Sequence, residues 1–447
     1  MNTPVWDFLR EYREKNTRRF HMPGHKGESG PLGCEIWDIT EIQGADSLYE
    51  ASGVIAESEE NASGLFGSRA TFYAAGGSSQ CVGAMLYLAL SASASRTVIT
   101  ARNVHKAFIH AAALLDMEPL WLWPEEGTSS LCTCPVTAES LERTLASLEA
   151  PPAAVYITSP DYLGNLADIP TLAEVCHRHG TLLLVDNAHG AYLRFLEDSL
   201  HPLDLGADLC CDSAHKTLPV LTGGAYLHIA RRHIPAKLAG RVREALALFG
   251  STSPSYLILA SLDLCNKYLA GEGPERIRTA AAQMAELKRA LVRGGWALAG
   301  DEPLKLTLDA PASDWNGLEL AERLRRGWVE PEYADRDHVV LMASGATDGE
   351  SFRAVEDALR RAAPGTPVSH PPLPLAKGER VLSVRQALFA PSERIPAGES
   401  LGRICGAPTV GCPPAVPIAV CGERIGEAAL ELFRRYGVET VEVLAGT

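Results

Sequence analysis

One lysine stands in a segment that otherwise has the composition of a buried strand and a turn. Residues 208–228 read DLCCDSAHKTLPVLTGGAYLH; the lysine is Lys216, with Ser213 and His215 shortly before it. The next lysine along the chain is Lys237. A lysine in a low-dielectric pocket has a depressed pKa and can act as an amine nucleophile that forms an imine with a carbonyl compound. A surface charge at the end of a strand is the alternative, and this segment alone does not decide between them.

A carboxylate ends another apolar run, TLLLVD, at Asp186. Placing a carboxylate at the end of a buried strand costs free energy unless the group has a partner. Asp186 could face a cation such as a protonated pyridine nitrogen, or it could be a helix cap or a structural aspartate. His189 follows three residues later, and Ala188 is small enough for a planar ring to lie against it.

Two further groups follow strand-like runs. The turn Gly76-Gly77-Ser78-Ser79 lies between a strand-like run and a helix-like run. Backbone N–H groups at a helix N-terminus, with two hydroxyls, can hold a phosphate, although either serine could instead only cap the helix. His105 comes just after the run TVITA. Its imidazole could stack on a flat aromatic ligand, or it could be an ordinary surface or core histidine.

The elements that must position these groups alternate between strand-like and helix-like patterns. Runs such as TLLLVD are continuously apolar, which is typical of strands covered on both faces. The sequence therefore predicts an α/β protein with a mainly parallel sheet. Ligands of such sheets bind at the carboxyl ends of the strands, where all four groups fall. Taken in order they supply a phosphate cradle, a stacking ring, a partner for a pyridine nitrogen and an imine-forming amine, which are the parts needed to hold pyridoxal 5′-phosphate (PLP).

Composition sets the remaining limits. The chain has 447 residues, 41 Lys and Arg against 55 Asp and Glu, and a net charge of −14. This balance argues against nucleic-acid binding. We find no apolar stretch that would span a bilayer and no signal-peptide pattern, so we expect a cytoplasmic protein. The eleven cysteines are irregularly spaced, which favours reduced thiols over disulfides, and no zinc-like spacing is completed, so we expect no metal site.

Several motifs resemble the Orn/Lys/Arg decarboxylase family of fold-type-I PLP enzymes, in its short bacterial form. The similarity covers nearly the whole chain and includes a C-terminal piece that a generic aminotransferase would not be expected to carry. The motifs are HMPGHKG (21–27), LYEASGVIAESEENASGLFG (48–67), YITSPDYLG (156–164), VDNAHGAYLRF (185–195), DSAHKTLPVLTGGAYLH (212–228), STSPSYLILASLD (251–263) and, C-terminally, RQALFAPSERIPAGESLGRI with CPPAVPIAVCGERI.

The resemblance implies a fold and a set of domains. It implies an aspartate-aminotransferase-like large domain and a smaller α+β C-terminal part. The expected divisions are an N-terminal segment (1–54), a PLP-binding large domain (55–294), a small α/β domain (295–363), a Pro-rich linker (364–379) and a family-specific C-terminal domain (380–447). Because fold-type-I sites usually lie at a dimer interface, it also implies a homodimer or a larger homo-oligomer.

By position, the resemblance also implies roles for single residues. Lys216 would form the imine with the cofactor, Asp186 would pair with its pyridine nitrogen, and His189 would lie near the imine. His105 would stack on one ring face and Ala188 on the other. The phosphate would be surrounded by Gly77, Ser78, Ser79, Ser213 and His215. The implied reaction is decarboxylation of arginine, lysine or ornithine to the polyamine-pathway amine and carbon dioxide.

The chain departs from common family forms at three positions. Asn187 stands where an acidic residue is frequent, Asp212 where an amide is frequent, and Ala214 where threonine is frequent. Asp212 would bring a negative charge close to the phosphate if its side chain pointed there. Glu423, in CGERI, is a candidate partner for the distal cation of the substrate. An aminotransferase, another carbon–carbon lyase, or a catalytically weak PLP-binding regulator remain alternatives, because a fold does not fix a function.

Overall fold

The structure is a computed structural model that describes residues 1–28, 30–124, 128, 130–231, 234, 236–366, 368, 372–409 and 414–446. The chain divides into two compact units. Unit 1 comprises residues 1–94 and 182–278, and unit 2 comprises residues 95–181 and 279–447. The five-part division expected from the sequence stays a prediction, and residues 367 and 369–371 of its linker lie outside the described residues.

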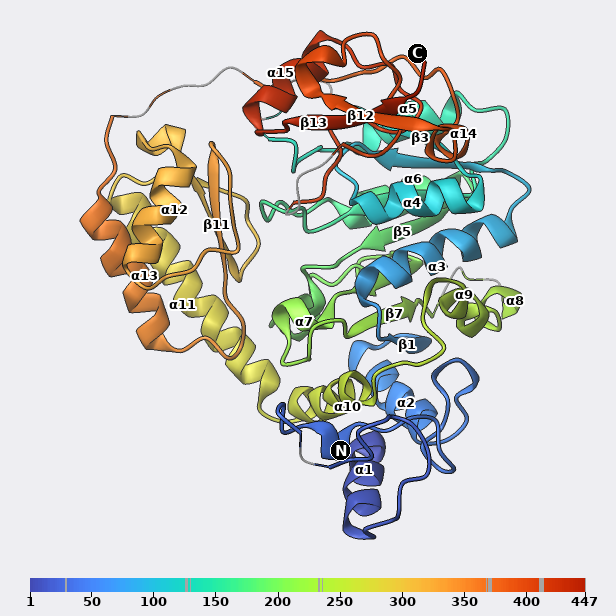
Figure 1. The fold of residues 1–447 in the computed structure, drawn as a ribbon. Coiled ribbons are helices and arrows are strands. Elements are labelled where there is room, and N and C mark those ends of the chain that lie inside the picture. Colours follow the sequence, from blue (N-terminus) through green and yellow to red (C-terminus); the bar gives the residue numbers. More distant parts are fainter. Residues whose placement is uncertain are drawn as a thin grey trace. The chain divides into compact units, whose positions relative to one another are not determined.

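Unit 1 contains four strands in the order β1-β7-β6-β5 (Figure 1). Their bounds are Ala70–Ala74 (β1), Ala225–Ile229 (β7), Leu209–Asp212 (β6) and Leu182–Asp186 (β5). β5 and β6 are parallel, and Asp186 pairs with Cys211. β7 runs antiparallel to both β1 and β6. β5 and β6 are buried along almost their whole length, as the continuous apolar runs predict for strands covered on both faces.

Two of the helices of unit 1 begin within three residues of a strand end, one after β1 and one after β6. Three of them lie N-terminal to or directly after β1: α1 (Pro4–Glu14), α2 (Val54–Phe66) and α3 (Gly77–Ala92). The short helix α7 (Ala214–Thr217) follows β6, and α8 (Ala236–Ala239), α9 (Val242–Phe249) and α10 (Tyr256–Ala270) come after β7. The glycine-serine segment therefore lies at the start of α3, and Lys216 lies in α7.

Unit 2 begins with three parallel strands in the order β4-β2-β3. These are β2 (Thr97–Ala101), β3 (Glu118–Leu122) and β4 (Ala154–Thr158). The helices α4 (Lys106–Leu115), α5 (Ala138–Ala146) and α6 (Ile169–Arg178) alternate with them along the chain. This alternation is the predicted α/β pattern.

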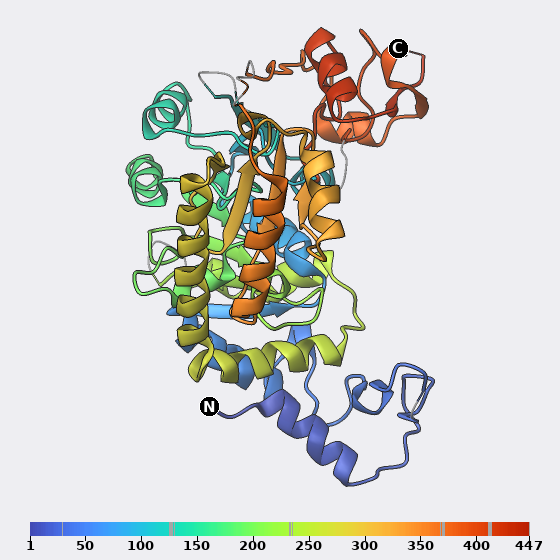
Figure 2. The same cartoon turned by 90° about the vertical axis from the view of Figure 1, so that its left-hand side faces the viewer.

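A second sheet of unit 2 is antiparallel, in the order β10-β11-β9-β8. Its strands are β8 (Leu298–Ala299), β9 (Lys305–Asp309), β10 (Tyr333–Ala334) and β11 (His338–Met342). The helices α11 (Gly273–Arg293), α12 (Gly317–Arg326) and α13 (Gly349–Ala362) lie on one side of this sheet (Figures 1 and 2).

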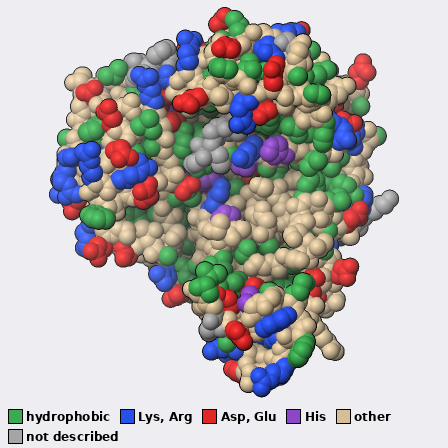
Figure 3. All heavy atoms as spheres, viewed as in Figure 1, with side chains coloured by type: hydrophobic (Ala, Val, Ile, Leu, Met, Phe, Trp, Pro, Cys, Tyr) green, Lys and Arg blue, Asp and Glu red, His purple; other side chains and the backbone are tan. Residues whose placement is uncertain are grey.

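The C-terminal segment of unit 2 has its own small core. It contains α14 (Val384–Leu388), β12 (Ser392–Pro396), α15 (Glu427–Arg435) and β13 (Thr440–Leu444). β12 and β13 pair antiparallel, and Cys405, Leu432, Phe433 and Val443 are among the buried residues beneath them. On the face seen in Figure 3, acidic and basic side chains are intermingled and form no extended basic patch among the coloured residues. No helix within the described residues is both long and apolar enough to cross a membrane.

Candidate functional site

Lys216 and His189 form the central contact of the site in unit 1. Lys216 Nζ lies 2.9 Å from His189 Nε2, a hydrogen bond in which either nitrogen can carry the shared proton. Lys216 is half-buried in α7, directly after β6, and His189 is buried shortly after the end of β5. The two parallel strands therefore bring together residues that lie 27 positions apart in the sequence. The lysine is consequently no isolated surface charge, because it has an imidazole as its neighbour.

Asp186 ends β5 as the sequence predicts, and it is 3% exposed. Its Oδ1 accepts hydrogen bonds from the Ala188 N–H at 3.2 Å and from the Cys211 thiol at 3.6 Å. The first bond folds the chain tightly after the strand, so that Ala188 and Asp186 lie beside each other. A buried carboxylate in this place is suited to a cationic partner.

The N-terminus of α3 has the properties of a phosphate cradle. The helix begins at Gly77 and has no side-chain cap at its N-cap residue, Gly76. Ser78 instead accepts a hydrogen bond from the Ser213 hydroxyl at 2.8 Å. The alternative in which a serine only caps the helix is therefore not what the structure contains. The backbone N–H groups of this first turn carry the positive end of the helix dipole and suit an anion.

Gly77 begins the helix at this place, and His215 lies beside it. Gly77 has φ +70°, and a Cβ built there would meet only His215 Cε1, at 3.9 Å. His215 Nδ1 donates a hydrogen bond to the Gly224 carbonyl at 2.9 Å. In the neutral ring Nε2 is therefore the nitrogen without a proton. Burial lowers the pKa of His215, the bond to Gly224 opposes this shift, and the charge of Lys216 adds to it. His215 is therefore a neutral imidazole near neutral pH.

Asp212 does not point toward the cradle, which corrects the expectation of a negative charge beside the phosphate. Its side chain is fully buried, and its two oxygens accept hydrogen bonds from Asn187, Cys210, His201 and His228. Burial acts to raise the pKa of Asp212, but the two histidines outweigh it and hold the pKa below its usual range. The physical reason is strand alternation: Cys211 faces Asp186, so Asp212 faces the opposite side of the sheet.

Two residues predicted for the site belong to unit 2. His105 is the N-cap of α4, where its Nδ1 accepts a hydrogen bond from the Ala107 N–H at 3.1 Å. Its ring-stacking role stays a prediction. Glu423 is 6% exposed, and its Oε2 accepts hydrogen bonds from Arg102 Nη2 and from the Val420 N–H, both at 2.9 Å. Burial raises the pKa of Glu423, and Arg102 acts against that shift. Because this carboxylate already neutralises a buried arginine, we do not propose it as a substrate ligand.

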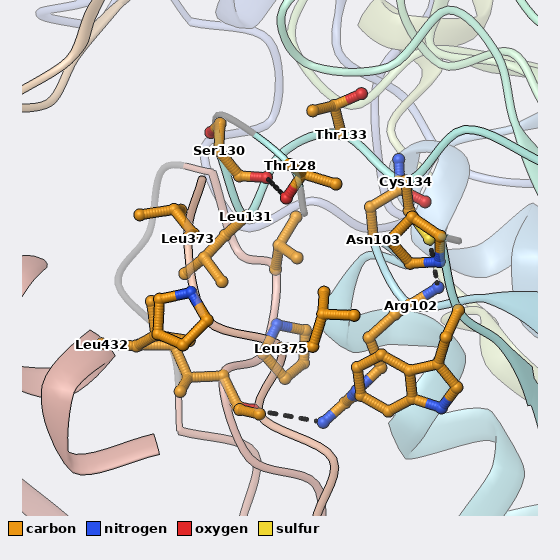
Figure 4. A pocket seen from close by; sticks show the side chains of 17 residues that line it. Arg102, Asn103, Thr128, Ser130, Leu131, Thr133, Cys134, Leu373, Leu375 and Leu432 are labelled. Carbon is orange, nitrogen blue, oxygen red and sulfur yellow. Dashed lines mark hydrogen bonds between the residues drawn. The ribbon is translucent and has the colours of Figure 1, made fainter. Parts of the chain in front are cut away.

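Arg102 also lines a pocket of unit 2 (Figure 4). Its guanidinium lies over the rings of Trp121 and Trp123, at 4.8 and 5.4 Å from the ring centroids, and donates to the Ile418 carbonyl. The arginine is therefore held by aromatic faces and a carbonyl as well as by Glu423. These contacts join the end of β2 to the C-terminal segment within unit 2.

The residues of unit 1 fit PLP on the chemistry of their donors. An uncapped helix start beside a glycine with positive φ suits the phosphate, a buried carboxylate at a strand end suits the pyridine nitrogen, and an amine bonded to an imidazole suits the aldehyde. Sequence reasoning missed His201 and His228. The alternation of strand β7 could have indicated His228, since it pairs with Cys210, but His201 lies in a loop with no such signal.

Comparison with known proteins decides the family. The family model described as "Orn/Lys/Arg decarboxylase, major domain" matches residues 3–323. The chain belongs to the Orn/Lys/Arg decarboxylase family. The resemblance inferred from the motifs is thereby confirmed.

Individual relatives match along nearly their whole length. The chain is 30% identical to the uncharacterized protein YaaO of Bacillus subtilis, over 97% of this chain and 94% of that protein. It is 29% identical to an arginine decarboxylase of the same organism, over 95% of this chain and 91% of that protein. The Orn/Lys/Arg decarboxylase relationship therefore extends to the C-terminal segment beyond residue 323.

Solved structures confirm the fold class. The lysine decarboxylase LdcF of Francisella novicida superposes with a TM-score of 0.80 at 18% identity, covering 99% of this chain and 81% of that chain. A serine palmitoyltransferase of Sphingomonas wittichii superposes with a TM-score of 0.56 at 14% identity, covering 70% and 78%. The fold is that of the fold-type-I PLP enzymes, as the sequence predicts.

Proposed function

We propose that this chain is a PLP-dependent decarboxylase that converts a basic amino acid to the corresponding amine and carbon dioxide. The observation that carries the proposal is the Lys216–His189 hydrogen bond, at the ends of two parallel strands, in a member of this decarboxylase family. Aminotransferases share such a site, but the family match favours the decarboxylase.

When bound, PLP would supply an aldehyde that condenses with amines and a ring that withdraws electrons from the bond to be broken. Lys216 would provide the amine that holds it. His189 Nε2, at 2.9 Å from Lys216 Nζ, is placed to take up or return a proton at that nitrogen as the lysine and the substrate exchange. The buried Asp186 would keep the pyridine nitrogen protonated through charge attraction.

The remaining residues would orient the cofactor. The first turn of α3 and the hydroxyls of Ser78, Ser79 and Ser213 would hold the phosphate, and neutral His215 would lie against it. Ala188, which is 9% exposed, would contact one ring face, and His105 would contact the other. Fixed orientation of this kind is a large part of what proteins contribute to such reactions.

A homodimer is part of the proposal. Phe20 is 98% exposed and Leu32 81% exposed in the N-terminal region of unit 1, which also contains the HMPGHKG motif. Leu221, five residues after the proposed imine lysine, is 51% exposed. Exposed large apolar side chains of this kind favour burial against a second copy. Light scattering coupled to gel filtration should give twice the mass of one chain or a multiple of it.

The direct test is incubation of the purified protein with PLP and, separately, with arginine, lysine and ornithine. Carbon dioxide with agmatine, cadaverine or putrescine supports the proposal and identifies the substrate. A keto acid would indicate an aminotransferase. Bound cofactor without any product would indicate a regulator that has lost its activity.

A further inference from the structure

A buried network in unit 1 lies directly behind the proposed site. Asp212, Asn187, His201, His228 and Cys210 are each fully shielded from solvent. His201 Nε2 and His228 Nε2 donate to Asp212 Oδ2 at 3.0 and 3.1 Å. Asn187 Nδ2 and the Cys210 thiol donate to Oδ1 at 2.7 and 3.6 Å. Four donors therefore converge on one carboxylate.

The negative charge of the cluster is on Asp212, and its four donors are two imidazoles, an amide and a thiol. His201 Nδ1 accepts a hydrogen bond from the Leu203 N–H, so its proton is on Nε2. Burial lowers the pKa of His228, although Asp212 opposes this shift. The rings of His201 and His228 pack against Phe66, with centroids 5.6 and 4.4 Å from it. A charge in such a dry environment needs every one of its hydrogen bonds.

Asn187 connects this cluster to the site. Its side chain donates to Asp212, its backbone N–H donates to the Cys211 carbonyl at 3.0 Å, and its carbonyl accepts from the Gly190 N–H at 2.8 Å. Position 190 has no room for a larger residue, since a Cβ there would come within 2.0 Å of Asn187 Oδ1. Asn187 is thus fixed at three points, and it stands between Asp186 and the pair Ala188–His189.

We propose that Asp212 is a positioning residue: through Asn187 it fixes the Asp186–His189 segment, and so aims the Asp186 carboxylate and the His189 imidazole at the cofactor. This role rests on the proposed function. Asp212 lies on the opposite side of the sheet from Asp186. It would therefore act on the cofactor only through its neighbours.

A metal site is the rival explanation, because ligand atoms of His201, Cys210 and Asp212 lie within 4.8 Å of one another. The hydrogen bonds argue against it. His201 Nε2 is the protonated nitrogen that donates to the carboxylate, whereas a metal ligand must be deprotonated. A stoichiometric metal ion in the purified wild-type protein, measured by elemental analysis, would overturn the positioning role.

The main variant is Asp212→Asn. The new amide would turn its oxygen to the two imidazoles, so that its NH₂ group would face the NH₂ group of Asn187. Asn187 could keep the pairing only by turning its amide over, which moves its NH₂ group to the present place of Oδ1 next to Gly190 and so changes its orientation. The double variant Asn187→Asp/Asp212→Asn restores the pairing, because the amide at 212 can then donate to a carboxylate at 187. Asp335→Asn is the matched control: Asp335 is also buried and bonded to His338 and Tyr333, but it belongs to unit 2.

Three quantities separate positioning from stability alone: the melting temperature of the cofactor-free protein, the PLP dissociation constant, and the pH midpoint of the visible absorbance of bound PLP. We expect Asp212→Asn to weaken PLP binding at least tenfold and to shift the midpoint, and the double variant to recover most of both. Asp335→Asn should lower only the melting temperature.

Each possible result decides the matter. Wild-type protein that binds no PLP contradicts the proposed function itself. If the wild type binds PLP but Asp212→Asn changes the PLP dissociation constant and the absorbance midpoint no more than Asp335→Asn does, the positioning role is contradicted. If Asp212→Asn does not fold but the double variant folds and binds PLP, the pairing is supported. If neither folds, the network serves stability alone and the inference is overturned.

Discussion

Asn187 Nδ2 donates a hydrogen bond to Asp212 Oδ1 at 2.7 Å, and both side chains are fully buried. The resemblance to the family leads us to expect an acid at 187 and an amide at 212. Here the amide is at 187 and the acid at 212. Since the two side chains touch, these two departures form one acid–amide pair with its members exchanged relative to that expectation.

The first prediction concerns the single variant Asn187→Asp. It would place two carboxyl groups face to face in a dry cluster, at a cost of roughly 3 kcal/mol or more in the free energy of unfolding near pH 8. One of the two would keep its proton, so its folded pKa would lie above the unfolded value of about 3.9. The contribution of this carboxyl group to the free energy of unfolding is then present at low pH and is lost as the pH rises through its folded pKa. Urea unfolding should show a smaller deficit at pH 5 than at pH 8; an equal deficit at both would contradict this reading.

His189 provides the second prediction. His189→Asn removes the nitrogen that lies beside Lys216 Nζ but retains a polar side chain. General acid–base contributions are worth about 10²–10⁴-fold, so turnover should fall by that order. The PLP dissociation constant should change by less than about tenfold, because both the proposed phosphate cradle and Asp186, the proposed partner of the pyridine nitrogen, keep their places. Steady-state kinetics and a PLP titration measure the two effects, and unchanged turnover would remove His189 from the proton-transfer role.

Glu423 provides the third prediction. Glu423→Gln leaves the buried Arg102 without its counter-charge, and breaking a buried pair typically costs about 3–5 kcal/mol. Thermal unfolding should therefore shift to lower temperature. The KM for the basic substrate should stay within about twofold of wild type at a temperature where the variant is folded, if the bond to Arg102 is the whole role of Glu423. A large rise in KM without loss of stability would instead support Glu423 as the partner of the substrate's distal cation.

Glu59 gives a prediction for pH. Burial raises its pKa from 4.5 to about 7, although Arg243 acts against the shift. As the pH rises from 4.5 to 7 the unfolded chain releases this proton first, so the free energy of unfolding falls with pH, by up to about 3 kcal/mol. Glu59→Gln should flatten that part of the stability profile. Its exposed neighbour supplies the control, Glu60→Gln, which should leave the slope unchanged. Equal slopes in wild type and Glu59→Gln would contradict the assignment.

The sequence allows most of the architecture to be predicted because each element carries its own local signal. TLLLVD is an uninterrupted apolar run that ends in a charge, and Gly76-Gly77-Ser78-Ser79 marks the turn before a helix. Both appear in the structure within a residue or two of the predicted place. The antiparallel direction of β7 was not predicted, because a continuous apolar run reads the same in either direction.

The site was only partly predictable for a different reason. Lys216 and Asp186 are unusual in their own segments, so each attracts notice without knowledge of its partner. The direction of the Asp212 side chain depends on which face of β6 it occupies, and its partner His201 comes from a loop. Glu423 was a candidate for the distal cation of the substrate, and only the packing of the C-terminal segment reveals its contact with Arg102. Such contacts between distant segments leave no local pattern.

The central claim is that Lys216 carries the cofactor. Borohydride reduction of the PLP-loaded protein makes the bond between PLP and its lysine permanent, and peptide mass spectrometry then locates it. We predict one pyridoxyl phosphate per chain, on the peptide that contains Lys216, and none in Lys216→Ala. A stoichiometric label on another lysine, or a Lys216→Ala protein that keeps its yellow chromophore, would contradict the account.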